Sequence, residues 1–193
     1  MYTLIIDSST KVLYEALVKG DKVVFEHYIK GQRDHAINIV KILEDMLKEE
    51  GIKVDDLGKI VCGIGPGSYT GVRMAVTVAK MMAVFKHIPL YKISTLALMA
   101  SGTKGEALAM IDARRGNAFC ARYNDGELED YEAIRSIAEY KELYPNAQIL
   151  TENEFKVDPF KVIELAKLHA NAHSLEPNYL QETEAERNLK NGN

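Results

Sequence analysis

Three short apolar stretches open the chain and predict β-strands. Residues 3–7 are apolar and largely β-branched and run into the turn-forming residues Asp-Ser-Ser-Thr, which is typical of a buried strand. Residues 12–18 and 22–28 predict two further strands, and Lys19-Gly20-Asp21 between them predicts a tight hairpin. The chain is therefore expected to begin with three antiparallel strands.

Helical periodicity follows these strands. Residues 34–50 place apolar side chains on two neighbouring stripes and end at Gly51, a common helix stop. One stripe is formed by Ala36, Val40, Leu43 and Leu47, and the other by Ile39, Ile42 and Met46. Later segments predict a strand over 59–64, a long helix over 69–87, a strand over 90–93 and a helix over 95–101. This order predicts an α/β fold in which a mixed sheet carries helices on its faces.

A second unit of the same kind is expected to start near residue 102. Polarity rises over 102–105, and the pattern then predicts strands over 107–112 and 118–123, a turn at Asp125-Gly126, a helix over 136–143, an apolar stretch over 148–150 and a final helix from Asp158-Pro159. The predicted domains are 1–101, which holds the two long helices, and 102–193, which is smaller and has a polar tail from about residue 181.

The helix over 69–87 is apolar on two sides. One stripe is enough to cover a sheet, so the second stripe is expected to meet another helix. That helix is either the one over 34–50 of the same chain or part of another protein, and both hypotheses are kept. The residues of the predicted partner interface are Ile39, Ile42, Met46, Met74, Val78, Met81 and Phe85.

Two turns that carry aspartate follow the first strand of each unit. A carboxylate with small hydroxyls at the end of a buried strand could bind a phosphate group and its magnesium ion, although the same residues also simply end strands. The candidate remnant phosphate turns are Asp7, Ser8 and Thr10 in the first unit and Asp112 in the second.

The loop Gly-Pro-Gly-Ser-Tyr-Thr-Gly over 65–71 joins a strand to a helix. Its residues Gly65, Gly67, Ser68 and Gly71 indicate either a structural elbow or a phosphate cradle at a helix N-terminus. The loop is not a P-loop, because no Lys-Ser or Lys-Thr pair follows the glycines.

Charge and composition restrict the function. A chain with a net charge of −4 and a pI near 5.8 lacks the basic footprint that nucleic-acid binding needs, so any nucleic acid would be held largely by another subunit. No apolar stretch reaches the length of a membrane span, and a cytoplasmic protein without membrane contact is expected. Cys62 and Cys120 lie in apolar strands and predict reduced core thiols.

Catalytic and metal-binding patterns are weak. His169 and His173 stand four apart on the predicted final helix, but no glutamate is placed as in HExxH, so no metal site is predicted. The chain also lacks a G-x-S-x-G elbow, a supported Cys-His pair and a carboxylate pair. It is therefore predicted not to be an enzyme on its own.

The string GPGSYTGVR over 65–73 resembles the bacterial TsaB (YeaZ) family, together with DSST over 7–10, IDARRG over 111–116 and PNYL over 177–180. The resemblance covers nearly the whole chain. It implies the fold of actin and sugar kinases, which is built from duplicated ribonuclease H-like domains.

The resemblance also implies a function and partners. Members of that family support the synthesis of N6-threonylcarbamoyladenosine at position 37 of tRNAs that read codons starting with adenine. The implied role is that of an accessory scaffold that forms a heterodimer with a TsaD-like catalytic subunit, with a TsaE-like ATPase as a further partner and tRNA bound only indirectly. No cofactor is expected on this chain alone, whereas ATP or ADP and a metal ion are expected in the complex through the partners.

The catalytic relative differs from this chain at two positions. It carries two metal-binding histidines four residues apart after a Pro-Leu pair like Pro89-Leu90, and their places are taken here by Thr95 and Met99, which cannot replace imidazoles. The alternative functions are an autonomous actin-like ATPase or small-molecule kinase and, less in keeping with the residues, a metalloprotease. A homodimer through the apolar helices is also expected in the absence of the partner.

Overall fold

The first sheet of the fold has six strands in the order β11-β5-β4-β1-β2-β3. The structure is a computed structural model that describes residues 1–30 and 35–180. β1 pairs antiparallel with β2 and parallel with β4, so the sheet is mixed. The strands are β1 (Tyr2–Asp7), β2 (Val12–Lys19), β3 (Lys22–Lys30), β4 (Leu57–Gly63), β5 (Leu90–Ile93) and β11 (Lys167–Leu168).

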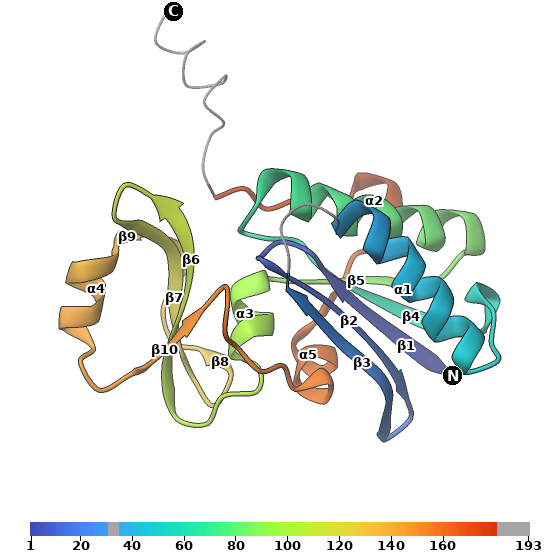
Figure 1. The fold of residues 1–193 in the computed structure, drawn as a ribbon, viewed down its shortest axis with the longest axis horizontal. Helices are drawn as coiled ribbons and strands as arrows, with labels where there is room; N and C mark the ends of the chain where they lie inside the picture. The colour runs from blue at the N-terminus through green and yellow to red at the C-terminus, as the bar shows by residue number, and fades with distance from the viewer. Residues whose placement is uncertain (31–34, 181–193) are drawn as a thin grey trace, which may run out of the picture.

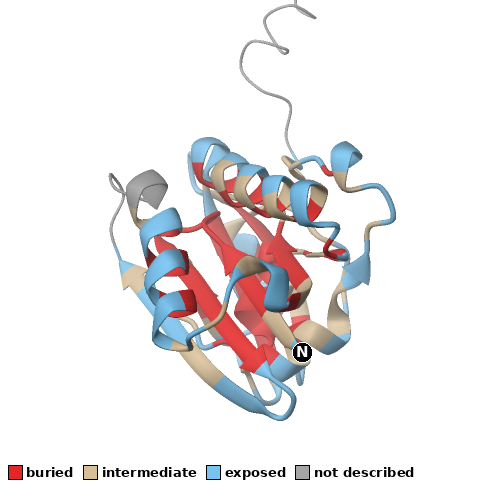
Figure 2. Ribbon diagram, turned by 90° about the vertical axis from the view of Figure 1, so that its right-hand side faces the viewer, coloured by how far each residue is buried: buried red, intermediate tan, exposed pale blue. Residues whose placement is uncertain are grey.

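Two long helices, α1 (His35–Glu49) and α2 (Tyr69–Lys86), cover one face of this sheet (Figure 1). Alternate residues of the strands point to opposite faces, and Leu4 and Leu13 therefore lie in the core under α1 and α2 while Ile5 and Tyr14 face the other side. The inward sides of both helices are buried and their outward sides are exposed (Figure 2). Between them in sequence lies the short helix η1 (Val54–Asp56).

The second sheet has five strands, with the order β10-β6-β7-β8 and with β9 also paired to β7. Leu96 and Met99 of α3 (Thr95–Ala100) pack against one face of it, and Tyr140 of α4 (Ile137–Leu143) packs against the other face. The strands are β6 (Glu106–Arg114), β7 (Asn117–Asn124), β8 (Glu127–Leu128), β9 (Ala133–Ser136) and β10 (Gln148–Thr151).

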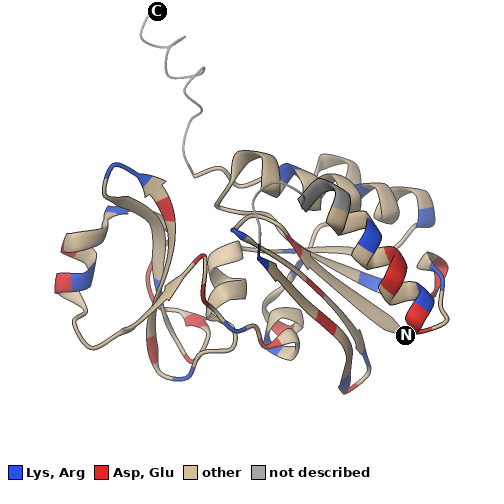
Figure 3. Ribbon diagram, viewed as in Figure 1, with Lys and Arg blue, Asp and Glu red and all other residues tan. Residues whose placement is uncertain are grey.

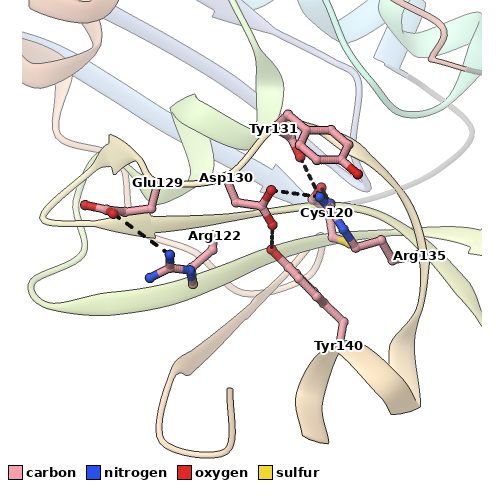
Figure 4. Close-up of polar contacts among 7 residues, drawn as sticks. All are labelled: Cys120, Arg122, Glu129, Asp130, Tyr131, Arg135 and Tyr140. Carbon is pink, nitrogen blue, oxygen red and sulfur yellow. Dashed lines mark hydrogen bonds and ion pairs between the residues drawn. The ribbon is translucent and has the colours of Figure 1, made fainter. Parts of the chain in front are cut away.

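A polar cluster around Arg135 ties β9 to β7 and α4 (Figure 4). The Arg135 guanidinium donates to the Cys120 carbonyl and to the Asp130 carboxylate, each at 2.9 Å. Asp130 in turn accepts a hydrogen bond of 2.8 Å from the Tyr140 hydroxyl, and the Arg135 guanidinium lies over the Tyr131 and Tyr140 rings. These contacts pair the charges of Arg135 and Asp130 with each other, so the cluster stabilises the second sheet.

The chain returns to the first sheet once the second sheet is complete. After β10, Val162 of α5 (Pro159–Leu165) packs on the face of Ile5 and Tyr14, and Leu175, which follows η2 (Ala172–Ser174), is buried in the core under α2. The division at 101/102 stays a prediction, and α5, β11 and η2 lie with the first sheet, not with the second.

Most predicted elements are confirmed to within about three residues at either end. The predicted start of the final helix is confirmed, because Asp158 caps α5 and Pro159 is its first residue. Its predicted extension to His173 is wrong, because α5 ends at Leu165 and Ala166 takes up an extended conformation from which Lys167 and Leu168 pair with β5. His169 and His173 are consequently not on a common helix. The predicted helix start at residue 34 and the polar tail from 181 lie outside the described residues, as does the side chain of Ala36.

Candidate functional site

The first aspartate turn is closed by the protein itself. Asp7 is only 2% exposed, and Ser8, Ser9 and Thr10 beside it are buried as well. One carboxylate oxygen of Asp7 accepts a hydrogen bond from the Ser9 N–H at 2.7 Å, and the other accepts one from the Thr95 hydroxyl at 2.6 Å. Burial raises the pKa of Asp7, and these two hydrogen bonds oppose the rise.

Thr95 links this turn to the glycine loop. Its hydroxyl donates to Asp7 and accepts from the Gly65 N–H at 3.0 Å, and its own N–H donates to the Gly65 carbonyl at 2.9 Å. Met99, one turn further along α3, is buried in the core of the second sheet. The two positions where the catalytic relative was expected to carry histidines therefore hold one internal hydrogen-bond linker and one core residue.

The glycine loop packs directly against the Asp7 turn. A Cβ atom at Gly67 would lie 2.2 Å from the Ser9 carbonyl oxygen, and one at Gly71 would lie 2.1 Å from the Ser8 carbonyl oxygen. Two amides of the loop are engaged within the chain: Ser68 N–H donates to the Ser9 carbonyl, and Gly71 N–H donates to the Ser68 hydroxyl, which caps α2. This geometry favours the structural elbow over the phosphate cradle.

Asp112 lies apart from the closed turn and is exposed. Its carboxylate accepts a hydrogen bond of 2.8 Å from the Arg114 N–H and so shapes the hairpin between β6 and β7. Lys11 follows the first turn and forms an ion pair with Glu152, which lies after β10; the ammonium nitrogen is 2.5 Å from a carboxylate oxygen. Glu152, and to a smaller degree Asp112, raise the pKa of Lys11. The charge of Asp112 in the second turn thus acts on the lysine that follows the first turn, while Asp7 itself is sealed.

An apolar groove of about 380 Å³ lies between α1 and α2. Ile39 and Val40 of α1 form one wall. Residues of α2 form the opposite wall: Tyr69, Thr70, Arg73, Met74, Thr77 and Val78. We call this feature the α1–α2 groove. Sequence reasoning missed the part of Val40, Tyr69 and Arg73 in it, because their role depends on how the two helices are placed together.

The predicted interface residues fall into two groups. Ile39, Ile42 and Met46 are buried in the core of this chain, which is the intramolecular helix contact that the sequence left open. Met74 and Val78 are half-buried in the α1–α2 groove, whereas Met81 is 54% exposed and Phe85 is 74% exposed. The second group, with the exposed Val40 beside it, is available to a partner.

Charged side chains are sparse on this surface. Figure 3 shows that α2 is largely uncharged, whereas the outer side of α1 carries both signs. Over residues 1–30 and 35–180 no group of three or more His, Cys, Asp or Glu residues is placed to hold a metal ion. Nε2 of His169 lies 3.1 Å from the Ser174 hydroxyl. Cys62 and Cys120 are free and buried, as predicted.

Within residues 1–30 and 35–180, no helix combines the length and the apolarity that crossing a membrane requires.

The chain is similar to known proteins both in sequence and in fold. A family model described as TsaD, tRNA N6-adenosine threonylcarbamoyltransferase, matches residues 26–168, well over half of the chain. The structure of YeaZ from Pseudomonas aeruginosa superimposes with a TM-score of 0.75 at 24% identity and covers 93% of this chain and 99% of that chain. The fold is therefore that of the actin-like α/β proteins, with two mixed sheets.

Two curated relatives carry the same name. The tRNA threonylcarbamoyladenosine biosynthesis protein TsaB of Bacillus subtilis is 35% identical over 134 residues, which are 67% of this chain and 58% of the relative. TsaB of Escherichia coli is 34% identical over 132 residues, which are 66% of this chain and 57% of the relative. The chain thus spans less than three fifths of the length of these relatives. It belongs to the TsaD-type family and, within it, to the TsaB (YeaZ) proteins.

Proposed function

We propose that the chain is an accessory subunit in the synthesis of N6-threonylcarbamoyladenosine at position 37 of tRNAs that read codons starting with adenine. In this proposal it forms a heterodimer with a TsaD-like catalytic subunit through the α1–α2 groove and the exposed end of α2. One observation carries the proposal: Met81 and Phe85 are exposed on α2, which also forms a wall of the apolar α1–α2 groove. The inward sides of both helices are already buried against the first sheet.

The energetics favour a protein partner for this surface. Burying a large apolar side chain stabilises an interface by about 1.5–3 kcal/mol. Val40, Met81 and Phe85 are each more than half exposed and lie on two adjacent helices. A partner helix that covers all three would therefore gain several kcal/mol, which is the kind of contribution that a few central residues make in stable interfaces.

The closed Asp7 turn supports a role without catalysis by this chain. Both oxygens of its carboxylate accept hydrogen bonds from protein groups, and the Ser9 and Ser68 amides donate to protein oxygens, so Asp7 is not free to hold a nucleotide or a metal ion. We therefore assign ATP or ADP, the metal ion and the transfer step to the TsaD-like subunit and a TsaE-like ATPase. tRNA would be held mainly by those partners because this chain has a net charge of −4. The complex is expected in the cytoplasm.

The docking proposal is tested by adding charge to the groove wall. We expect the double variant Val78→Glu, Met81→Glu to lose co-purification with the TsaD-like subunit while its circular dichroism spectrum stays that of the wild type. Leu143→Glu is the matched control, because Leu143 is also exposed but lies on α4 in the other half of the chain. Undiminished binding of the double variant would contradict the proposal.

The functional role is tested by reconstitution. The TsaD-like subunit, the TsaE-like ATPase, ATP, a threonylcarbamoyl donor and tRNA are expected to form modified adenosine only when this chain is added. Modification of equal yield without the chain would refute the accessory role. In the absence of the partner, the same apolar surface is expected to pair two copies of the chain, which sedimentation analysis would detect.

The alternative of an autonomous ATPase or small-molecule kinase needs an open Asp7. Its test is magnesium-dependent ATP turnover by the pure chain that is lost in Asp7→Ala. We expect no such turnover, because Asp7 is buried and hydrogen-bonded to Ser9 and Thr95. The metalloprotease alternative is tested by metal analysis of the purified chain.

A further inference from the structure

Two motifs that are distant in the sequence meet at Arg73. Tyr69 and Arg73 belong to the glycine-loop string over 65–73, and Tyr179 belongs to the string over 177–180. The rings of Tyr69 and Tyr179 are stacked, with centroids 5.1 Å apart and an interplanar angle of 24°. The Arg73 guanidinium lies over the Tyr69 ring at 5.1 Å and donates a hydrogen bond to the Tyr69 hydroxyl.

Tyr179 is held in this position by the segment that carries it. Asn178 N–H donates to the Ile64 carbonyl at 2.7 Å, so the segment is tied to the glycine loop. Leu175 is buried in the core under α2, and its carbonyl accepts a hydrogen bond of 3.0 Å from Lys80. The stacked pair therefore rests on the fixed part of the fold and orients Arg73 before any partner binds.

The charge of Arg73 is not neutralised within the described part of the chain. α2 carries Arg73, Lys80 and Lys86 and has no acidic residue. Lys86 pairs with Asp55 at 2.8 Å and Lys80 binds the Leu175 carbonyl, whereas Arg73 has no ion pair with a carboxylate of residues 1–30 or 35–180. Arg73 is also the charged member of the groove wall described above.

Arg73 begins an outward stripe on α2. Arg73, Thr77, Met81 and Phe85 follow one another at a spacing of four residues, and all are exposed. At a rise of 1.5 Å per residue the stripe is about 18 Å long. A helix that packs along it would meet apolar side chains at the Phe85 end and a guanidinium at the other end.

We propose that Arg73 determines specificity at this docking surface: held by Tyr69 and Tyr179, it pairs with a carboxylate on the docked helix of the TsaD-like subunit. The inference rests on the proposed function. A planar guanidinium binds a carboxylate with two parallel hydrogen bonds, so the pair would fix both the direction and the register of the partner helix. The C-terminal segment 175–180 thus takes part in partner recognition by positioning Arg73.

The test measures the affinity of the purified chain for the TsaD-like subunit of the same organism by calorimetry at low and high salt. Loss of one member of a desolvated charge pair is expected to weaken binding about 30-fold or more in Arg73→Glu and about 10-fold or more in Arg73→Ala, and Arg73→Lys to recover part of the loss. The salt dependence of binding should shrink in Arg73→Ala. Tyr179→Ala should weaken binding less than Arg73→Ala, because it removes only the support.

Arg115→Glu is the matched control, since it makes the same charge change at an exposed position in the turn between β6 and β7. It should bind like the wild type. Scanning the acidic residues of the partner's docked helix to arginine should find one change that restores the binding of Arg73→Glu. That restoration would identify the paired carboxylate.

The two proposals fail in different ways. If the wild-type chain does not bind the TsaD-like subunit, the proposed function fails. The docking site stands if the wild type binds and the double variant Val78→Glu, Met81→Glu does not. The inference about Arg73 is overturned if, in addition, folded Arg73→Glu and Arg73→Ala bind with the affinity and salt dependence of the wild type.

Discussion

Glu15 is a buried carboxyl group in the middle of β2. It is 0% exposed, and neither of its carboxyl oxygens has a hydrogen-bond partner in the described part of the chain. By strand alternation it lies on the same face as Leu13 and Leu17, under the helices. Burial raises the pKa of Glu15 to about 9, so the group is protonated in the folded protein at neutral pH.

This shift predicts a pH dependence of stability. The pKa of Glu15 is 4.5 when the chain is unfolded and about 9 when it is folded, so the folded state binds the proton more tightly. The contribution of Glu15 to the free energy of unfolding is therefore fully present below pH 4.5 and is lost as the pH rises to about 9. We expect Glu15→Gln to be more stable than the wild type by about 2–5 kcal/mol at pH 9 and by much less at pH 5.

Urea unfolding at several pH values measures this difference. Glu44→Gln is the matched control, because Glu44 is exposed on α1 and should shift stability little at any pH. A constant difference between Glu15→Gln and the wild type from pH 5 to pH 9 would show that the carboxyl group is ionised in the fold.

The hydroxyl group of Thr95 is expected to contribute to the stability of the fold. Thr95→Val keeps the shape but leaves the buried Gly65 N–H and one Asp7 oxygen without their partner. The expected cost is about 2–4 kcal/mol in the free energy of unfolding, since each unsatisfied buried group costs about 1–3 kcal/mol. Thr77→Val on the exposed side of α2 should change stability by less than about 0.5 kcal/mol. Equal effects of the two variants in chemical denaturation would argue against the linker role of Thr95.

The junction of the glycine loop with α2 depends on the absence of a side chain at Gly71. Alanine normally favours a helix over glycine, by about 0.5–1 kcal/mol. At Gly71, however, the added Cβ would meet the Ser8 carbonyl oxygen at 2.1 Å, and the backbone would have to move. We expect Gly71→Ala to lower the free energy of unfolding by about 1–3 kcal/mol, and the melting temperature should fall with it. Thr70→Ala, one residue earlier and exposed, should be neutral or slightly stabilising.

Elements with a strong periodic pattern and clear ends could be predicted from the sequence. α2 follows its predicted span because Ser68 caps it and its inward residues repeat at helical spacing. β11 could not be predicted, since two residues form a strand only by pairing with the edge of β5. The same limit explains the error over His169 and His173: the pattern did not indicate that the chain would leave the helix at Ala166.

The candidate site could be predicted only in part. Apolar spacing identified Met81 and Phe85 as a second exposed side of α2, and it placed Ile39 and Met46 on a helix-contacting side without deciding which helix they meet. The stacking of Tyr69 on Tyr179 joins segments more than a hundred residues apart, and no local pattern encodes such a contact.

At the scale of the whole molecule, the first sheet is not completed by residues 1–101. Val162 of α5 and Leu175 fill its two faces, and β11 covers the outer edge of β5. We therefore expect the fragment 1–101 to lack a cooperative thermal transition, whereas the full chain should show one. Calorimetry and backbone amide spectra would measure both. A cooperatively folded 1–101 fragment would instead support the predicted division at 101/102.

The return of the chain to α2 sets the order of events during synthesis. The ribosome delivers β1 to β5 first, whereas Leu175, which closes the core beneath α2, emerges only after the whole second sheet. Until then the nascent N-terminal half has an unfilled hydrophobic face, while the second sheet, built from strands close together in sequence, can already fold. Chaperones that protect newly made chains should therefore remain on α1 and α2 until Leu175 has left the ribosome.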